Sequence, residues 1–314
     1  MAVYRKMRTA GLAAAFGLIA AGGWNMAERP DGLQAAEPFA ESSVAPPHPT
    51  YVVGMSDKFA VRALSERVRR PWQGFERFAG SELEKFAGVA YGAGGAGCGA
   101  GKTLVNFEQM DCVTFIENVL ALALTEKDYA LKPAGDQELF HAFVQNLNRV
   151  RYYEGVNCRW DDRIYYFTDA LRQLEDAGLM TDVARINGEP FNKKIEYLSK
   201  NPQKFSGIED WNKVKRVERE MSSRRRYFYP LSELERYAGL AKTGDVVALA
   251  TDVAGLDVSH CGIVHLDEKR SGADKLFFTH ASSVKKKVVY RQNLCDYLAT
   301  RTSITGIFVY RPVF

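Results

Sequence analysis

The feature that most constrains this chain is a change of pattern at Gly244. After that residue, short runs of β-branched and aromatic side chains follow one another at hairpin-like spacings. Before it, from Ser56 to about Leu240, apolar residues recur at helical spacings. This segregation predicts an α+β fold, with N-terminal helices packed on a C-terminal antiparallel sheet. The predicted strands are 245–251, 260–266, 275–282, 287–291 and 306–313.

Helix start signals occur in the first part of the chain. Ser81 with Glu84, and Ser232 with Glu235, have the spacing of a capping box. A further helix is expected to follow Asp136, because the apolar residues after it share one stripe.

The N-terminal segment has the pattern of an export signal. Arg5, Lys6 and Arg8 form a basic start, and the apolar run 10–23 is too short to span a bilayer comfortably. The proline-rich stretch that follows lacks apolar periodicity, which is typical of a linker. We predict a periplasmic or otherwise exported protein that either loses its leader or keeps it as an anchor. The predicted segments are a signal peptide or anchor at 1–36, a linker at 37–55 and one main domain at 56–314.

The net charge and the cysteine content argue against several classes of function. The formal net charge is only +4, and a dense basic run such as 224–226 is most often a solvated helix end, so we expect no nucleic-acid partner. Five cysteines in an exported chain leave at least one thiol unpaired, and the pairing of the others stays open. The chain lacks Cys-x-x-Cys and His-Glu-x-x-His spacings, so we predict no metal site and no cofactor.

Cys112 is the thiol whose context indicates chemistry. It opens an almost wholly apolar segment, 112–122, which predicts a central buried helix capped by Asp111. Unpaired N–H groups and the helix dipole in a first turn favour a thiolate. They also favour the oxyanion that forms when a thiolate attacks a carbonyl. The alternative is a small buried residue that packs the helix start.

Two histidines on consecutive predicted strands supply a base and a group to orient it. Strand alternation puts His260 and His265 on opposite faces, and we expect only His260 to face the helix of Cys112. Gly262 leaves room beside His260 for another backbone or a substrate. His280 lies on the next predicted strand, where it can fix the tautomer of His260.

Tyr91 lies in a glycine-rich segment, 88–95, upstream of the predicted Cys112 helix. A tyrosine hydroxyl held there can donate to an oxyanion. Glycine-rich runs also bind phosphate, but 101–103 does not close this run with the spacing of a P-loop. The sequence therefore favours an oxyanion donor over a nucleotide site.

In combination, these segments resemble the N-acetylmuramoyl-L-alanine amidase-like family, a branch of the NlpC-type papain-like cysteine peptidases. The resemblance implies a papain-like NlpC-type fold with Cys112 as nucleophile, His260 as base, His280 as third member and Tyr91 as oxyanion donor. It also implies hydrolysis of the amide between N-acetylmuramic acid, in its 1,6-anhydro form, and L-alanine. The likeness runs from about residue 56 to the C-terminus, in 91–95, 111–124, 151–155, 244–245, 255–260 and 280–283.

The chain departs from the family pattern at two places. The stretch 161–166 differs, which affects substrate preference more than chemistry. Cys261 stands where the family commonly has valine, and alternation predicts that it points away from the active face. Aromatic and charged residues near these motifs suit sugar rings and stem-peptide carboxylates, although packing is an alternative for them. The predicted substrate-binding residues are Arg151, Tyr152, Arg163 and Asp257.

The predicted activity is a cysteine-dependent peptidoglycan amidase that acts on muropeptides and requires no protein partner. One alternative is an endopeptidase that cuts between D-glutamate and diaminopimelate with the same catalytic residues. A second is an acyltransferase that uses the same thioester, and a third is a catalytically inactive module that binds the cell wall. Product analysis on defined muropeptides separates the two hydrolases, and labelling of the Cys112 thiol tests the inactive module.

Overall fold

The computed structural model describes residues 51–53, 68–92, 98–99, 102–153, 155 and 158–314. The predicted leader, 1–36, lies outside the described residues, as does most of the predicted linker. At the end of the predicted linker, β1 (Tyr51–Val53) pairs in parallel with β4 (Lys102–Val105). No helix in the described part of the chain is long and apolar enough to span a membrane.

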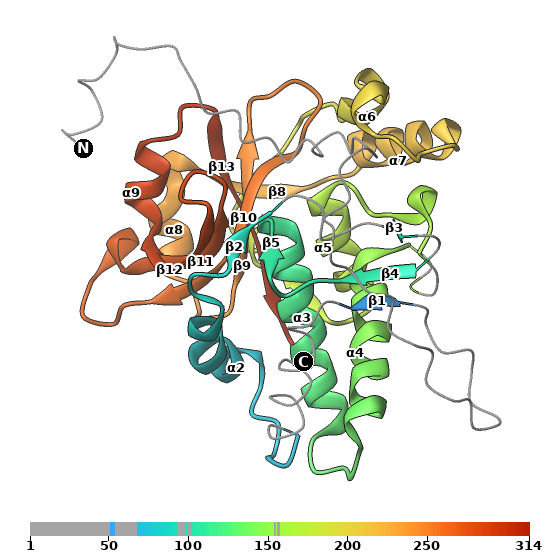
Figure 1. The fold of residues 1–314 in the computed structure, drawn as a ribbon. Coiled ribbons are helices and arrows are strands. Elements are labelled where there is room, and N and C mark those ends of the chain that lie inside the picture. Colours follow the sequence, from blue (N-terminus) through green and yellow to red (C-terminus); the bar gives the residue numbers. More distant parts are fainter. Residues whose placement is uncertain (1–50, 54–67, 93–97, 100–101, 154, 156–157) are drawn as a thin grey trace.

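A ten-stranded, mostly antiparallel sheet forms the centre of the described structure (Figure 1). Its C-terminal strands confirm the predicted α+β arrangement, and they neighbour one another in the order β12-β11-β10-β9-β13. Each is a run of β-branched, aromatic and other apolar residues that is long enough to be recognised in the sequence. These strands are β9 (Val246–Thr251), β10 (Val258–Leu266), β11 (Leu276–Ser282), β12 (Lys287–Asn293) and β13 (Ile304–Pro312).

Short strands that the sequence did not predict extend both ends of this sheet. At one edge β2 pairs with β12 and with β5, and at the other β8 and β7 follow β13, which also pairs with β6. These strands are β2 (Ala90–Tyr91), β5 (Gln109–Met110), β6 (Met180–Asp182), β7 (Glu189–Pro190) and β8 (Tyr227–Pro230). A separate small sheet has the order β1-β4-β3, with β3 at Cys98–Gly99.

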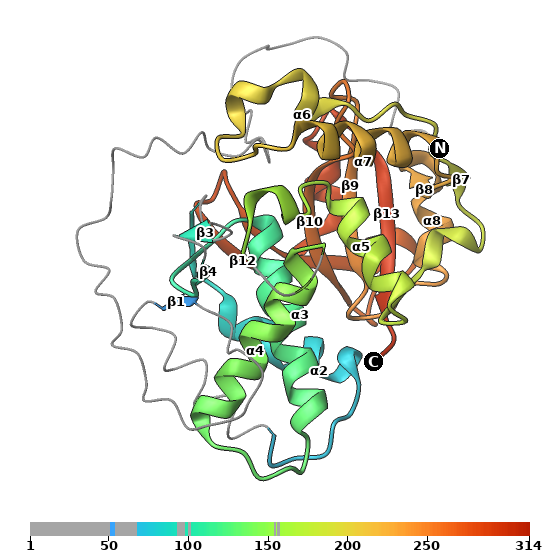
Figure 2. The ribbon, with the colours of Figure 1, turned by 90° about the vertical axis from the view of Figure 1, so that its right-hand side faces the viewer.

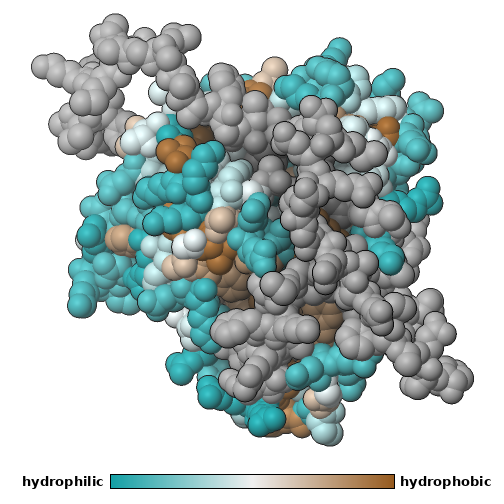
Figure 3. All heavy atoms as spheres, in the orientation of Figure 1, coloured by the Kyte–Doolittle hydropathy of each residue, from teal (hydrophilic) through white to brown (hydrophobic). Residues whose placement is uncertain are grey.

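Helices cover both faces of the main sheet (Figures 1 and 2). One hydrophobic cluster joins α3 (Cys112–Tyr129) and α5 (Phe167–Asp176) to one face, and α4 (Asp136–Arg151) packs on the outer side of α3. A second cluster joins α8 (Leu234–Ala238) and α9 (Leu294–Ala299) to the other face. On the face seen in Figure 3, the described surface is mostly hydrophilic, with small hydrophobic areas. The remaining helices are α2 (Phe75–Glu82), α6 (Tyr197–Lys200) and α7 (Trp211–Ser223).

The start of α3 is fixed by the cap that the sequence predicted. Asp111 Oδ1 accepts a hydrogen bond from Thr114 N at 2.7 Å, and Thr114 Oγ1 accepts one from Asp111 N at 2.9 Å. The two other predicted capping boxes are wrong. Ser81 lies inside α2, where its hydroxyl donates to Arg77 O, because that helix starts further upstream. Ser232 lies in a 3-10 turn before α8 and makes no side-chain cap.

The Asp111 cap leads to a stability prediction. Asp111→Ala should lower the free energy of unfolding by about 1 kcal/mol, because the N–H of Thr114 loses its acceptor. Asp111→Asn should retain most of that stability, since an amide oxygen can accept the same bond. Urea denaturation of the two variants measures the difference. Equal stability of both variants would show that the cap does not stabilise the helix.

Candidate active site

Cys112 is the first residue of α3 and is buried, with 2% of its surface exposed. The first hydrogen bond of the helix runs from Phe115 N to Asp111 O. The N–H groups of Cys112 and Val113 therefore have no acceptor among the described residues. Two such donors at the positive end of a helix are suited to an oxyanion. Cys112 is a free thiol, as predicted.

Two further cysteines, Cys261 and Cys295, are free, and Cys158 is disulfide-bonded.

The parallel pairing of β2 with β5 brings Tyr91 towards the start of α3. Tyr91 lies opposite Met110, which shortly precedes Cys112, and it packs against the hydrophobic cluster around Cys112. Burial, followed by the electrostatic effects of Cys112 and Asp111, raises the pKa of Tyr91. The phenol is therefore protonated at neutral pH and can donate a hydrogen bond. The structure thus places Tyr91 beside the predicted nucleophile.

His260 and His280 are joined as predicted. His260 Nε2 lies 2.7 Å from His280 Nδ1, and the two rings are perpendicular. Burial, followed by the effect of His280, holds the pKa of His260 well below its usual value. Burial also lowers the pKa of His280, to about 4. Both imidazoles are therefore neutral at neutral pH.

Aromatic side chains that sequence reasoning missed enclose this pair. The ring of Tyr297, on α9, stacks on His260 with centroids 5.5 Å apart. Phe278 stacks on His280 at 4.2 Å, and the guanidinium of Arg301 lies 4.8 Å from the Tyr297 ring centroid. A short helix such as α9 gives little periodic signal, so its contact with the site was not predictable from the pattern.

The orientation of His260 differs from the prediction. Its strand has a bulge between Val258 and His260 in the pairing with β9, so alternation is interrupted there. Val258 and Cys261 consequently both join the cluster around α3, whereas His260 contacts Tyr297 on the other face. Within the described residues, no hydrogen bond joins the Cys112 thiol to either imidazole.

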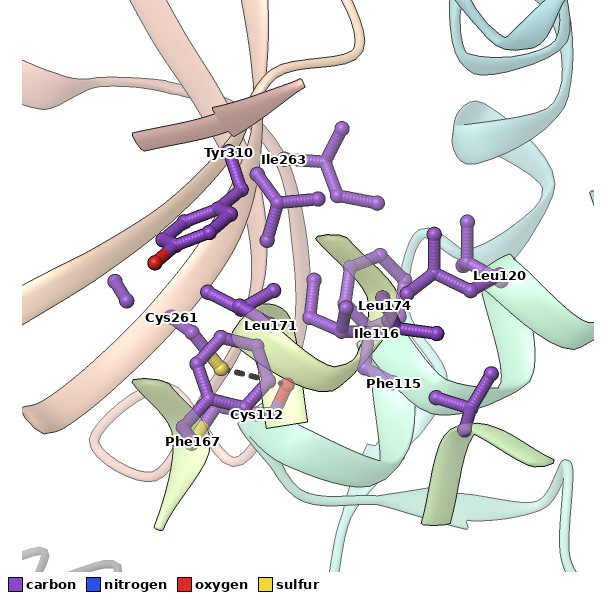
Figure 4. Packing of buried hydrophobic residues seen from close by; sticks show 14 of the residues in the cluster. Cys112, Phe115, Ile116, Leu120, Phe167, Leu171, Leu174, Cys261, Ile263 and Tyr310 are labelled. Carbon is purple, nitrogen blue, oxygen red and sulfur yellow. Dashed lines mark hydrogen bonds between the residues drawn. The ribbon is translucent and has the colours of Figure 1, made fainter. Parts of the chain in front are cut away.

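Cys261, the neighbour of His260, contacts Cys112 directly (Figure 4). Its Sγ donates to Cys112 O at 3.1 Å. Burial, followed by its hydrogen bond with the Cys112 side chain, raises the pKa of Cys261 well above its usual value. The prediction that Cys261 points away from the nucleophile is therefore wrong, because the strand face that packs on α3 is the face of Cys261 and Ile263 and not that of His260. The contact places the first turn of α3 against β10 next to His260.

The room left by Gly262 is filled by β11. A Cβ at this position would lie 2.5 Å from Phe278 Cδ2 and 2.8 Å from Thr279 O. The sequence predicted either another backbone or a substrate beside Gly262, and the structure places a backbone there. His265 is buried, and its Nε2 lies 2.9 Å from Thr279 Oγ1. Its contacts in the described structure are with Thr279 and Tyr290 and not with His260, so it remains suitable as an internal control.

Two predicted substrate-binding residues, Arg151 and Arg163, are instead buried around Glu117 of α3. Arg151 Nε lies 2.9 Å from Glu117 Oε2, and Arg163 Nη2 lies 2.5 Å from Glu117 Oε1. Arg151 Nη1 also donates to Leu104 O at 2.9 Å. Their guanidinium groups therefore stabilise the packing of α3 and do not reach a substrate.

The two other predicted substrate contacts are also internal. Tyr152 and Asp257 are each 1% exposed. Asp257 Oδ2 accepts hydrogen bonds from Thr168 N at 3.0 Å and Thr168 Oγ1 at 2.7 Å, at the first turn of α5. Burial contradicts a substrate contact for both residues. In the sequence, such buried polar groups cannot be distinguished from exposed ones next to a motif.

A cavity of about 560 Å³ lies among α4, α5 and α7. Asp169, within it, accepts hydrogen bonds from the Tyr153 hydroxyl at 2.8 Å and from Arg224 at 3.0 Å. The predicted catalytic residues do not line this cavity. The His, Cys, Asp and Glu residues of the described ranges form no group of three that could hold a metal ion. The basic residues of the cavity are Arg149, Arg172, Lys213, Arg216 and Arg224.

Known proteins with this fold include an amidase. A solved N-acetylmuramoyl-L-alanine amidase from Bacteroides uniformis is 28% identical, with a TM-score of 0.66 over 76% of this chain and 99% of that one. A Bacteroides fragilis structure, provisionally named a xylanase, is 29% identical, with a TM-score of 0.63 over 74% and 99%. A Legionella pneumophila protein, 20% identical with a TM-score of 0.57 over 82% and 94%, shares the fold.

No curated protein matches the chain. The family model described as N-acetylmuramoyl-L-alanine amidase-like matches residues 83–307, which is well over half of the chain. The chain therefore belongs to the N-acetylmuramoyl-L-alanine amidase-like family.

Proposed function

We propose that this protein is an exported cysteine amidase of the papain-like NlpC type, and that it hydrolyses the bond between anhydro-N-acetylmuramic acid and L-alanine in peptidoglycan fragments. The observation that carries the proposal is the free Cys112 thiol at the start of α3, beside two N–H groups without acceptors in the described structure. The family match, and the name of the Bacteroides uniformis structure, support the substrate class.

In this mechanism, neutral His260 takes the proton of the Cys112 thiol. The thiolate attacks the lactyl carbonyl carbon, and the oxyanion accepts hydrogen bonds from N–H groups of the first turn and from the Tyr91 hydroxyl. His260 then protonates the nitrogen of L-alanine as the C–N bond breaks, which leaves a thioester. Water, deprotonated by His260, attacks the thioester and releases the muramic carboxylate and the thiol.

The thiol and the imidazole have to approach each other for this reaction. Catalytic hydrogen bonds in unliganded enzymes are often long and tighten only when substrate binds. The hydrogen bond from the Cys261 thiol to Cys112 O already joins the two elements next to His260. Tyr297 is associated with both catalytic residues. Its ring stacks on His260, and the pKa of its hydroxyl is raised first by burial and also by the electrostatic effect of Cys112.

Mass analysis of defined muropeptides tests the proposal. An amidase releases a stem peptide that begins with L-alanine, whereas the endopeptidase alternative leaves L-alanine and D-glutamate on the sugar. Matched substrates with and without the anhydro ring test the sugar preference. A glycosidase would need a facing carboxylate pair, but Asp111 and Glu117 are engaged in the cap and the arginine pair. Cleavage only after D-glutamate, or no cleavage at all, would refute the amidase.

Substitutions of the strand histidines should lower the rate of hydrolysis by unequal amounts. His260→Ala should lower it by about 10²–10⁴-fold, because no base or acid remains. His280→Ala should lose less, and His280→Asn should recover part of that loss, because an amide can still hydrogen-bond His260 Nε2. Steady-state rates on an anhydro-muropeptide measure this order. His265→Gln is the control and should be near parental; a folded His265→Gln slower than His260→Ala would overturn the assignment of the base.

A further inference from the structure

Gln292, on β12, extends the histidine pair to a third side chain. His280 Nε2 lies 3.1 Å from Gln292 Oε1, and Lys285 Nζ lies 3.3 Å from the same oxygen. A lysine ammonium can only donate hydrogen bonds, so the atom that it contacts has to be the carbonyl oxygen of the amide. His280 Nε2 contacts that same oxygen and must therefore carry a hydrogen.

This assignment fixes the hydrogens along the chain of side chains. A neutral imidazole carries one ring hydrogen, so His280 Nδ1 is an acceptor and His260 Nε2 must donate to it. Neutral His260 then has its lone pair on Nδ1, which has no hydrogen-bond partner among the described residues. Burial lowers the pKa of His280, the hydrogen bond with Gln292 acts to raise it, and the two charged groups that face the ring, Lys285 and Arg301, act to lower it. Burial and these two charges favour the neutral form that this arrangement requires.

A bulge in β12 turns Gln292 towards His280. His280 pairs with Val289, and a regular register would put Arg291 opposite Phe278, but Gln292 takes that place. One residue is therefore inserted, and a shift of one residue turns the following side chains to the other face. Arg291 has a φ of 52°, in the left-handed region that a side chain such as arginine rarely adopts. Strained backbone of this kind is often found at functional sites.

We propose that Gln292 is a positioning residue that holds His280, and through it His260, in the tautomers with hydrogen on Nε2, so that Nδ1 of His260 is the base. The kinetic part of this inference rests on the proposed function. The tautomers of the two histidines do not depend on the proposed function, so they provide a readout that is independent of turnover.

The kinetic test compares two substitutions of the same side chain. Gln292→Leu should lower kcat by about 10–100-fold with little change in KM, as for other residues that orient a histidine. Gln292→Glu keeps an acceptor, but its carboxylate favours protonated His280, which has no free Nδ1 for His260. The acidic limb of its pH–rate profile should therefore move up by about 1 pH unit or more. Gln203→Leu, on an exposed 3-10 turn, is the control.

Nitrogen-15 NMR of the imidazoles provides the second test, and the chain has only five histidines to assign. The parent should show hydrogen on Nε2 of both His260 and His280, and folded Gln292→Leu should show mixed tautomers at His260. Hydrogen on Nδ1 of His260 in the parent, or a folded Gln292→Leu with parental rate and tautomers, would overturn the inference. A parent with these tautomers but no turnover would refute the proposed function alone.

Discussion

Cys112→Ala should abolish amide hydrolysis. The expected loss is on the order of 10⁴-fold or more, because removal of a nucleophile ends the covalent route and leaves only binding and oxyanion stabilisation. Cys112→Ser should be similarly inactive, since a hydroxyl is far less acidic than a thiol. The measurement is steady-state release of stem peptide from an anhydro-muropeptide, with circular dichroism and urea denaturation to confirm the fold.

The other free thiols are the matched controls for this prediction. Cys261→Val removes the weak hydrogen bonds of its thiol to Cys112 O and to the Cys112 side chain and fills a similar volume, so its rate should stay within a few-fold of the parent. Cys295→Ser, on α9, should be parental. A folded Cys112→Ala protein that turns over substrate at the parental rate would refute the nucleophile. A Cys261→Val protein as inactive as Cys112→Ala would move the chemistry to the second thiol.

The parts of the fold with strong local patterns were predictable from the sequence. The C-terminal strands are β-branched and aromatic runs long enough to be recognised, and the almost wholly apolar run after Asp111 predicted α3 with its cap. The edge strands β2 and β5 have two residues each, so no period can mark them. The parallel pairing that brings Tyr91 to the start of α3 was therefore visible only in the structure.

The site was predictable where it depends on neighbours in the chain, and not where it depends on register. The contact of His260 with His280 follows from adjacent strands, and it was predicted. Alternation correctly put His260 and Cys261 on opposite faces of their strand, but it cannot say which face packs on α3, and the prediction chose the wrong one. The bulge between Val258 and His260 has no signature in the sequence, so the face of Val258 could not be used to make that choice.

Glu117→Gln should strongly destabilise the protein. Glu117 is 3% exposed on α3, and it is the shared partner of Arg151 and Arg163, which are 1% and 7% exposed. The substitution leaves two buried guanidinium groups without their counter-charge. Breaking a buried pair in this way costs about 3–5 kcal/mol, because desolvation of the remaining charge is no longer compensated. The hydrogen bonds from Arg151 to Leu104 O and from Arg163 to Arg151 O would remain, but carbonyls carry no net charge.

Urea denaturation measures this loss against a surface ion pair of the same type. Glu220 contacts Arg224 at 3.4 Å, with both side chains substantially exposed, so Glu220→Gln should cost less than about 1 kcal/mol. Replacing Glu117, Arg151 and Arg163 together by apolar residues should recover much of the stability lost in Glu117→Gln, since no charge would then be buried. If Glu117→Gln cost no more than Glu220→Gln, the guanidinium groups would have to reach water in solution, and their exclusion as substrate contacts would no longer hold.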